Sequence, residues 1–274
     1  MTLVSPSHLT FSAVDDLAFA AQQGRLQGKP VNTIFIPQHI GPLLELVHLS
    51  GNGQLPPLDS NPWISLAAYK TFYWVFTSGC DQWICPYSKR LGFIRTSWDP
   101  SGDTPEWDAF RYLMQRAATE AGFSARIPAK LVGAIGELQS NLHEHSGTAH
   151  TGVIAFQAVS EGFEFVVADR GMGVLKSLRG CAEYADLPDG GKALSLALTD
   201  GVSRFGTASG RGLGFRQIFV GLAYLNGTLR FRSDDHALTI DGYNPKLPMA
   251  RVRQRPKIAG FFASVLCSLQ STVG

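Results

Sequence analysis

Apolar residues recur every three or four positions in several stretches of the chain, and this spacing is typical of α-helices with one buried face. It predicts helices over residues 9–24, 40–49 and 105–122. The buried stripe of a further helix is formed by Leu131, Ile135, Leu138 and Leu142. The apolar stretch at residues 215–225 predicts a buried helix as well.

Short apolar runs predict strands between these helices. We expect a short strand at residues 33–36 and a central strand at residues 163–167 that ends at Ala168 and Asp169. Residues 258–269 are apolar too, but they fall short of the roughly twenty residues that a membrane helix needs, so they are expected to be the last strand. Helices and strands together indicate an α/β protein.

Length and composition allow a sizeable core, since the chain has 274 residues and 45% of them are hydrophobic. We expect a small N-terminal α/β module of unknown role, residues 1–125, and a second domain, residues 126–274. In the first, the aromatic stretch at residues 63–76 is expected to pack inside, with a partner surface as the alternative.

Charge and targeting signals indicate neither a nucleic-acid partner nor a membrane partner. The formal net charge is +2, and the basic residues at 251–257 are typical of a solvated loop, so no nucleic acid is expected. No signal peptide is recognised at the start, so we predict a cytoplasmic protein without a membrane partner. Cys80 and Cys85 are separated by four residues with no matching pair, which favours free thiols over a zinc site.

Glu137 and Asn141 lie four residues apart on one predicted helix and therefore share a face. A carboxylate beside an amide oxygen suits a hydrated magnesium ion and an attacking water, because magnesium prefers oxygen ligands and keeps several waters. The alternative for such a pair is a solvated polar edge of the helix.

Asp169 ends the predicted central strand and is followed by Gly171 and Gly173. A carboxylate that is poorly solvated seeks a donor, and the exocyclic amine of adenine is one. The glycines would let the backbone approach a base or a sugar closely. An ordinary tight turn after a strand is the alternative.

Residues 206–214 are rich in glycine and other small residues, and they run into the predicted helix at 215–225. Such a loop exposes N–H groups to phosphate, and the helix start adds partial positive charge, which Arg204 and Arg211 could reinforce. The loop follows a helix rather than the first strand of a βαβ unit, so a dinucleotide-binding fold does not fit. A phosphate-binding lysine of the P-loop type is also missing. Together, the Glu137–Asn141 helix, the Asp169–Gly173 turn and the loop at 206–214 predict an ATP pocket.

With these motifs, residues 127–269 resemble the Bergerat-fold (GHKL) ATPase domain of gyrases, heat-shock chaperones, histidine kinases and mismatch-repair ATPases. Residues 141–146, 201–203 and 210–214 most resemble those of the anti-sigma-factor serine kinases. The resemblance implies an α+β two-layer sandwich, in which a mixed, largely antiparallel sheet is covered by the Glu137 helix and the helix after Gly214. The small α/β module would precede it.

The resemblance also implies roles for single residues. Glu137 would match the general base or its relic, Asn141 the Mg2+ ligand, and Asp169 the residue that holds the adenine amine. His145 would contact a phosphate, or else would make only local hydrogen bonds. The glycine turns and the phosphate loop correspond to Gly171, Gly173, Gly210, Arg211, Gly212 and Gly214. The lid of the family would correspond to residues 181–209.

Two features depart from the family pattern. Members often carry Gly-Thr near the start of the final strand, where this chain has Gly260 and Phe261, so Ser264 or Thr239 would have to replace the threonine. The predicted helix at 105–122 also contains no histidine, so no phosphoacceptor helix precedes the ATPase region.

The expected function is that of a signalling protein that binds ATP and Mg2+, with slow ATP hydrolysis or phosphoryl transfer to an unidentified protein partner. The alternatives are a non-catalytic ATP-dependent switch and a protein-interaction module. Some members of the superfamily pair, so a homodimer is a further possibility.

Overall fold

The computed structural model describes residues 7–26, 34–56, 58, 66–96, 103–124, 126–160, 162–198, 227–240 and 250–269. The helices are α1 (Phe11–Gln22), α2 (Ile40–Gly51), α3 (Ala67–Thr77), α4 (Pro105–Glu120), α5 (Arg126–His145), α6 (Gly173–Arg179) and α7 (Gly190–Ala197), with short 3-10 turns η1 (Ala149–Thr151) and η2 (Ala182–Tyr184). The strands are β1 (Ser7–Leu9), β2 (Phe35–Pro37), β3 (Gln82–Ile84), β4 (Leu91–Arg95), β5 (Val153–Val159), β6 (Gly162–Asp169), β7 (Thr228–Ile240) and β8 (Arg251–Ser268).

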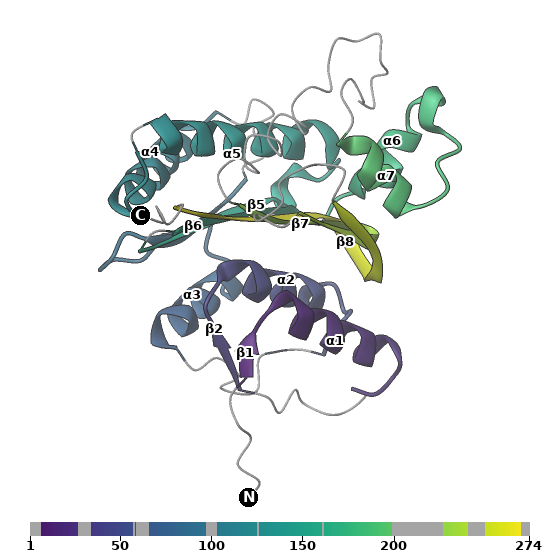
Figure 1. Ribbon diagram of the computed structural model, residues 1–274, viewed down its shortest axis with the longest axis horizontal. Coiled ribbons are helices and arrows are strands. Elements are labelled where there is room, and N and C mark those ends of the chain that lie inside the picture. The colour runs from purple at the N-terminus through teal and green to yellow at the C-terminus, as the bar shows by residue number, and fades with distance from the viewer. Residues whose placement is uncertain are drawn as a thin grey trace, which may run out of the picture.

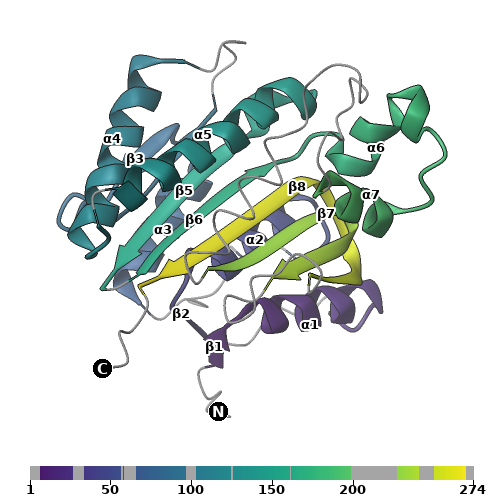
Figure 2. The same ribbon diagram turned by 45° about the horizontal axis from the view of Figure 1, so that its top comes forward.

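A six-stranded sheet in the order β3-β4-β5-β6-β8-β7 runs through the middle of the molecule, and its described pairings are all antiparallel (Figures 1 and 2). Strands β1 and β2 form a separate parallel pair. The predicted α/β class, a sandwich of helices on a largely antiparallel sheet, is therefore confirmed. The predicted central strand is β6, which is buried along its whole length between β5 and β8.

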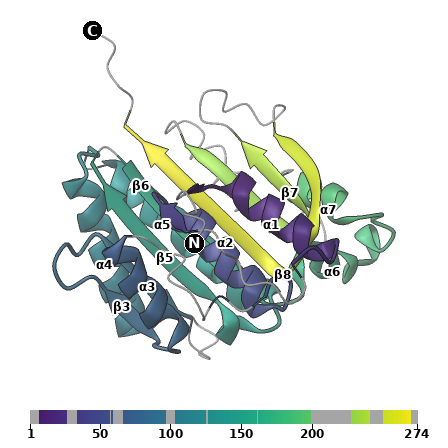
Figure 3. The same ribbon diagram turned by 90° about the horizontal axis from the view of Figure 1, so that it is seen from below.

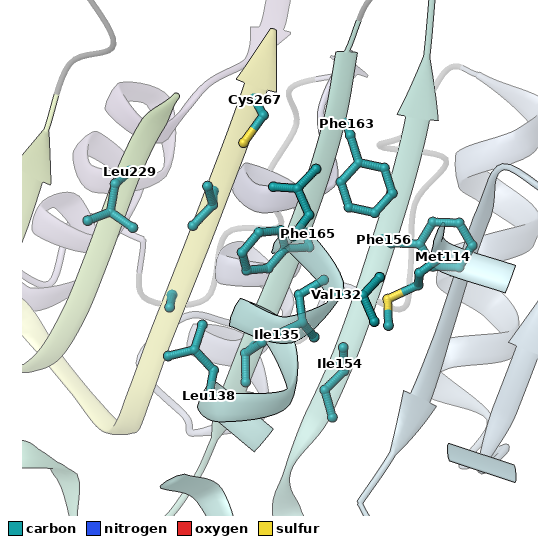
Figure 4. Packing of buried hydrophobic residues seen from close by; sticks show 14 of the residues in the cluster. Met114, Val132, Ile135, Leu138, Ile154, Phe156, Phe163, Phe165, Leu229 and Cys267 are labelled. Carbon is teal, nitrogen blue, oxygen red and sulfur yellow. The ribbon is translucent and has the colours of Figure 1, made fainter. Parts of the chain in front are cut away.

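Helices α4 and α5 cover one face of the sheet (Figure 2). The predicted stripe of α5 is buried, and Val132, Ile135 and Leu138 point toward the aromatic side chains of β5 and β6 (Figure 4). The helix ends where Gly147 adopts a left-handed conformation with φ +72°, as glycine often does after a helix. The expected cover of the sheet by the Glu137 helix is thus confirmed. The helix expected at 215–225 lies outside the described residues.

Helices α1, α2 and α3 lie against the opposite face of the sheet, and so add a layer to the two-layer sandwich that was expected (Figures 1 and 3). Their apolar side chains share one core with Phe93, Val166 and Phe262 of the sheet. The sheet also crosses the expected division at residue 125, because β4 pairs with β5. The division itself stays a prediction.

Several sequence expectations are modified by tertiary contacts. The helix expected at 9–24 begins at Phe11, because Ser7–Leu9 pair with β2 instead. The basic residues at 251–257 were expected to form a loop, but they form the first part of β8. There Arg255 donates a hydrogen bond of 2.6 Å to Asp15. The aromatic stretch does pack inside at Phe72 and Phe76, whereas Trp74 of the same helix is 63% exposed.

Two further expectations concern the cysteines and the membrane. All four cysteines are free thiols, as predicted. Among the described residues, no helix is both long and apolar enough to cross a membrane.

Candidate functional site

Asp169 is the last residue of β6 and is only 2% exposed. Its register partner on β8 is Phe261, whose backbone N–H donates to the Asp169 carboxylate. The N–H of Gly171 donates to Oδ1 of the same carboxylate at 2.5 Å. The carboxylate is therefore held in one orientation by the backbone on two sides.

Burial raises the pKa of Asp169 from 3.8 to about 7, although the hydrogen bonds from Gly171 and Phe261 act in the opposite direction. No cation among the described residues contributes to the pKa of this carboxyl, so the effect of burial prevails. Carboxyl groups with such raised pKa values are concentrated at binding and catalytic sites.

The turn after Asp169 lies directly against the end of α5. The N–H of Met172 donates to the carbonyl oxygen of Ser146 at 2.9 Å. A side chain at Gly171 would overlap with that carbonyl group and crowd Oδ1 of Asp169. Gly173 has φ +75°, a conformation that disfavours other residues. These glycines permit close approach of protein segments, and the predicted close approach to a nucleotide stays a prediction.

A β-bulge in β8 lies beside Asp169. The pairing of β7 with β8 slips between Ser233, opposite Phe261, and Asp234, opposite Ile258. Gly260, inside this bulge, has φ +68°, and a Cβ there would overlap with the Asp169 backbone and carboxylate. Bulges of this kind often re-aim side chains next to functional sites. Gly260 and Phe261, at the position where Gly-Thr was expected, lie next to Asp169.

Ser233 of β7 lies at this site too, although its sequence context did not predict a functional role. Its hydroxyl donates to the carbonyl oxygen of Gly260 at 3.0 Å and accepts from the N–H of Val174 at 2.9 Å. It thereby connects the bulge to the first turn of α6. No sequence signal marked this serine, because the contact joins strands and a helix that are distant in the chain.

Neither residue suggested as a substitute for the threonine lies at Asp169. Ser264 pairs with Val166 and its hydroxyl faces Glu164 at 3.4 Å, beside the start of α2. Thr239 pairs with Arg251 at the other end of β7. This expectation is therefore wrong for both, because a side chain's face and position along the sheet are set by strand register.

The candidate residues on α5 occupy its C-terminal half, the half that ends against the Asp169 turn. Glu137 is exposed, Asn141 is half-buried, and His145 is half-buried with Nε2 3.9 Å from the carboxylate of Glu144. An exposed carboxylate and a half-buried amide on one helix face are open to water and to a ligand. That Glu137 and Asn141 act together on a magnesium ion and an attacking water stays a prediction.

The remaining predicted site residues, Gly210, Arg211, Gly212 and Gly214, lie outside the described residues, as does Arg204. Of the expected lid, residues 181–198 are described and include α7, which buries Ala193 and Leu194. Residues 199–209 lie outside the described part.

In the described ranges no group of three or more His, Cys, Asp or Glu side chains could hold a metal ion. That Asn141 binds Mg2+ stays a prediction.

Comparison with known proteins gives no assignment of its own: the chain has no significant match to any protein-family profile, curated protein or solved structure.

Proposed function

We propose that the protein binds ATP with Mg2+ beside Asp169 and uses the nucleotide as a regulatory switch, with slow hydrolysis or phosphoryl transfer to a protein partner. The observation that carries the proposal is the buried carboxyl of Asp169, oriented at the end of a central strand. An adenine amine would add a third donor to the two backbone N–H groups, and hydrogen bonds to a charged acceptor are among the stronger ones.

Each proposed residue has a distinct role. Asp169 accepts the adenine amine, Asn141 contributes an oxygen to Mg2+, and Glu137 activates the attacking water. Bound Mg2+ neutralises phosphate charge, which is most of what phosphoryl transfer requires. The glycines at 210–214 would surround the phosphates, by resemblance to the Bergerat-fold ATPases.

Calorimetric titration of the full chain with ATP and Mg2+ tests the proposal. Asp169→Asn is expected to weaken binding about 10- to 100-fold, the range for losing a hydrogen bond to a charged group. Asp108→Asn, a change on the exposed face of α4, is the matched control and should leave affinity unchanged. The proposal fails if the parent chain binds no ATP or if Asp169→Asn binds it equally well.

The pH dependence of binding gives a sharper test. The ionised carboxylate accepts the amine, so protonation of Asp169 competes with ATP. Because its pKa is about 7, affinity should rise about tenfold between pH 6 and pH 8. Titration in buffers of different ionisation enthalpy should show proton release on binding. The rise should be absent in Asp169→Asn.

Phosphate release separates catalysis from a non-catalytic switch. Glu137→Ala should abolish turnover while sparing ATP affinity, if Glu137 is the general base. Retained turnover would contradict that role. Binding by the parent chain without any turnover would instead identify a switch that works by occupancy alone.

A further inference from the structure

A cavity of about 630 Å³ lies on the opposite face of the sheet from α5, between α2, α3 and the strands. Its apolar wall is formed by Leu44, Val47, Val153, Ala168 and Phe262. The volume is within the range of small-molecule sites, which are mostly apolar with a few polar groups.

Two arginines line this cavity, and none of its described lining residues is acidic. Arg95 donates to the carbonyl oxygens of Phe76 and Cys80 at 2.8 and 3.1 Å, and its guanidinium lies 4.8 Å from the centre of the Phe76 ring. Nη2 of Arg170 lies beside Gly51, where a Cβ would overlap with it, and its guanidinium forms no ion pair or hydrogen bond with the described residues.

The two guanidinium groups are close enough to repel each other. The pKa of Arg95 is lowered mainly by burial and secondly by the charge of Arg170, while Asp81 acts in the opposite direction. His48 adds no charge at neutral pH, because burial lowers its pKa to about 4 and its Nε2 lies 2.9 Å from the carbonyl oxygen of Ala259. An anion between the arginines would relieve this repulsion.

Trp74 supplies an exposed aromatic surface at the same cavity. It is 63% exposed, although it belongs to a helix whose Phe72 and Phe76 are buried. An exposed tryptophan beside two arginines and an apolar wall matches a ligand with both a flat apolar body and a negative head group.

We propose that this cavity binds a small amphipathic anion, a carboxylate or phosphate attached to an aromatic or aliphatic body. The head group lies between Arg95 and Arg170, and the body packs against Trp74 and the apolar wall. The proposal is independent of ATP binding, because side chains alternate along β6: Ala168 and Arg170 belong to this face, whereas Asp169 belongs to the other.

Calorimetry with three probes of one shape tests the head group. We expect 2-naphthoate or 2-naphthyl phosphate to bind the full chain at least tenfold more tightly than uncharged 2-naphthamide. The tighter of the two anions identifies the head group. Saturating ATP should not displace it, which separates the cavity from the site at Asp169.

Exposed residues allow variants that spare the fold. Arg170→Gln should weaken anion binding about tenfold without changing naphthamide binding, and Trp74→Ala should weaken all probes several-fold. Arg116→Gln and Tyr112→Ala, on exposed positions of α4, are the matched controls. The proposal is overturned if neither anion binds at millimolar concentration, if naphthamide binds as well as the anions, or if Arg170→Gln has no effect.

Discussion

At the scale of single residues, Asp169 combines burial with a fixed orientation. Its neighbours Gly171 and Gly260 leave room for the carboxylate, and two backbone N–H groups hold it. A protein that needed this position only for packing would gain stability from an apolar side chain there. The buried carboxyl is therefore a cost in stability that a binding role would explain.

Asp169 should give the protein a measurable pH dependence of stability. Its folded pKa is raised from 3.8 to about 7, so its contribution is fully present below pH 3.8 and is lost as the pH rises to about 7. This difference in pKa corresponds to at most about 4 kcal/mol. Urea unfolding of the parent chain and Asp169→Asn at pH 5 and pH 8 should show a larger loss in the parent. Equal losses would contradict the raised pKa.

Gly260 is expected to be the least replaceable glycine near the site. Gly260→Ala would place a methyl group against the Asp169 backbone at φ +68°, so we expect a loss of at least about 2 kcal/mol in the free energy of unfolding. Gly133→Ala on α5 is the control, because open space surrounds it and alanine favours helices; it should stabilise by up to about 1 kcal/mol. Chemical denaturation measures both, and an equal effect of the two changes would refute this account.

At the scale of elements, buried polar contacts fix α1 and α2 on the sheet. Arg230 of β7 donates to Glu45 of α2 and Asp15 of α1, each at 2.6 Å. Glu45 also accepts from Arg232. The first N–H groups of α2, at Ile40 and Gly41, donate to Glu164 of β6, so a strand residue caps this helix. These contacts position α2, one of the two helices that line the cavity.

Glu45→Gln should destabilise the protein by about 3 kcal/mol, because it leaves buried arginines without their shared carboxylate. Burial opposes ionisation of Glu45, but Arg230 and Arg232 prevail and lower its pKa to about 2. The stability from this carboxylate is thus present above pH 4.5 and is lost as the pH falls through about 2. Glu120→Gln, in an exposed pair with Arg116, should cost less than about 1 kcal/mol. Similar costs for both variants in urea unfolding would contradict the prediction.

In the whole molecule, the two faces of one sheet contribute to two separate hydrophobic cores. Residues on one face of β6 pack under α5, and those on the other face pack against α2. The two candidate sites lie on opposite faces of the same strand end, because Asp169 lies between Ala168 and Arg170 in the chain. The hydrophobic core on each face of the sheet contains residues from both halves of the chain.

Residues 126–274 expressed alone should therefore not form a stable monomer. The fragment would expose the face of β6 and β8 that α1–α3 cover, and it would leave β5 without β4. We expect dye binding to exposed apolar surface and no cooperative unfolding transition, whereas the full chain should unfold cooperatively. A stable, cooperatively folding fragment would show that the division at residue 125 separates independent domains.

The amino-acid pattern was sufficient to predict several local elements and the place of Asp169 at the end of a buried strand. Apolar periodicity located α5 and β6 because burial of one helix face or a whole strand leaves a repeating pattern. The strand order, the bulge at Gly260, the contacts of Ser233 and the presence of both Arg95 and Arg170 at one cavity follow only from the fold in three dimensions. These depend on which distant segments meet, and pairing register and side-chain packing leave no local signature in the chain.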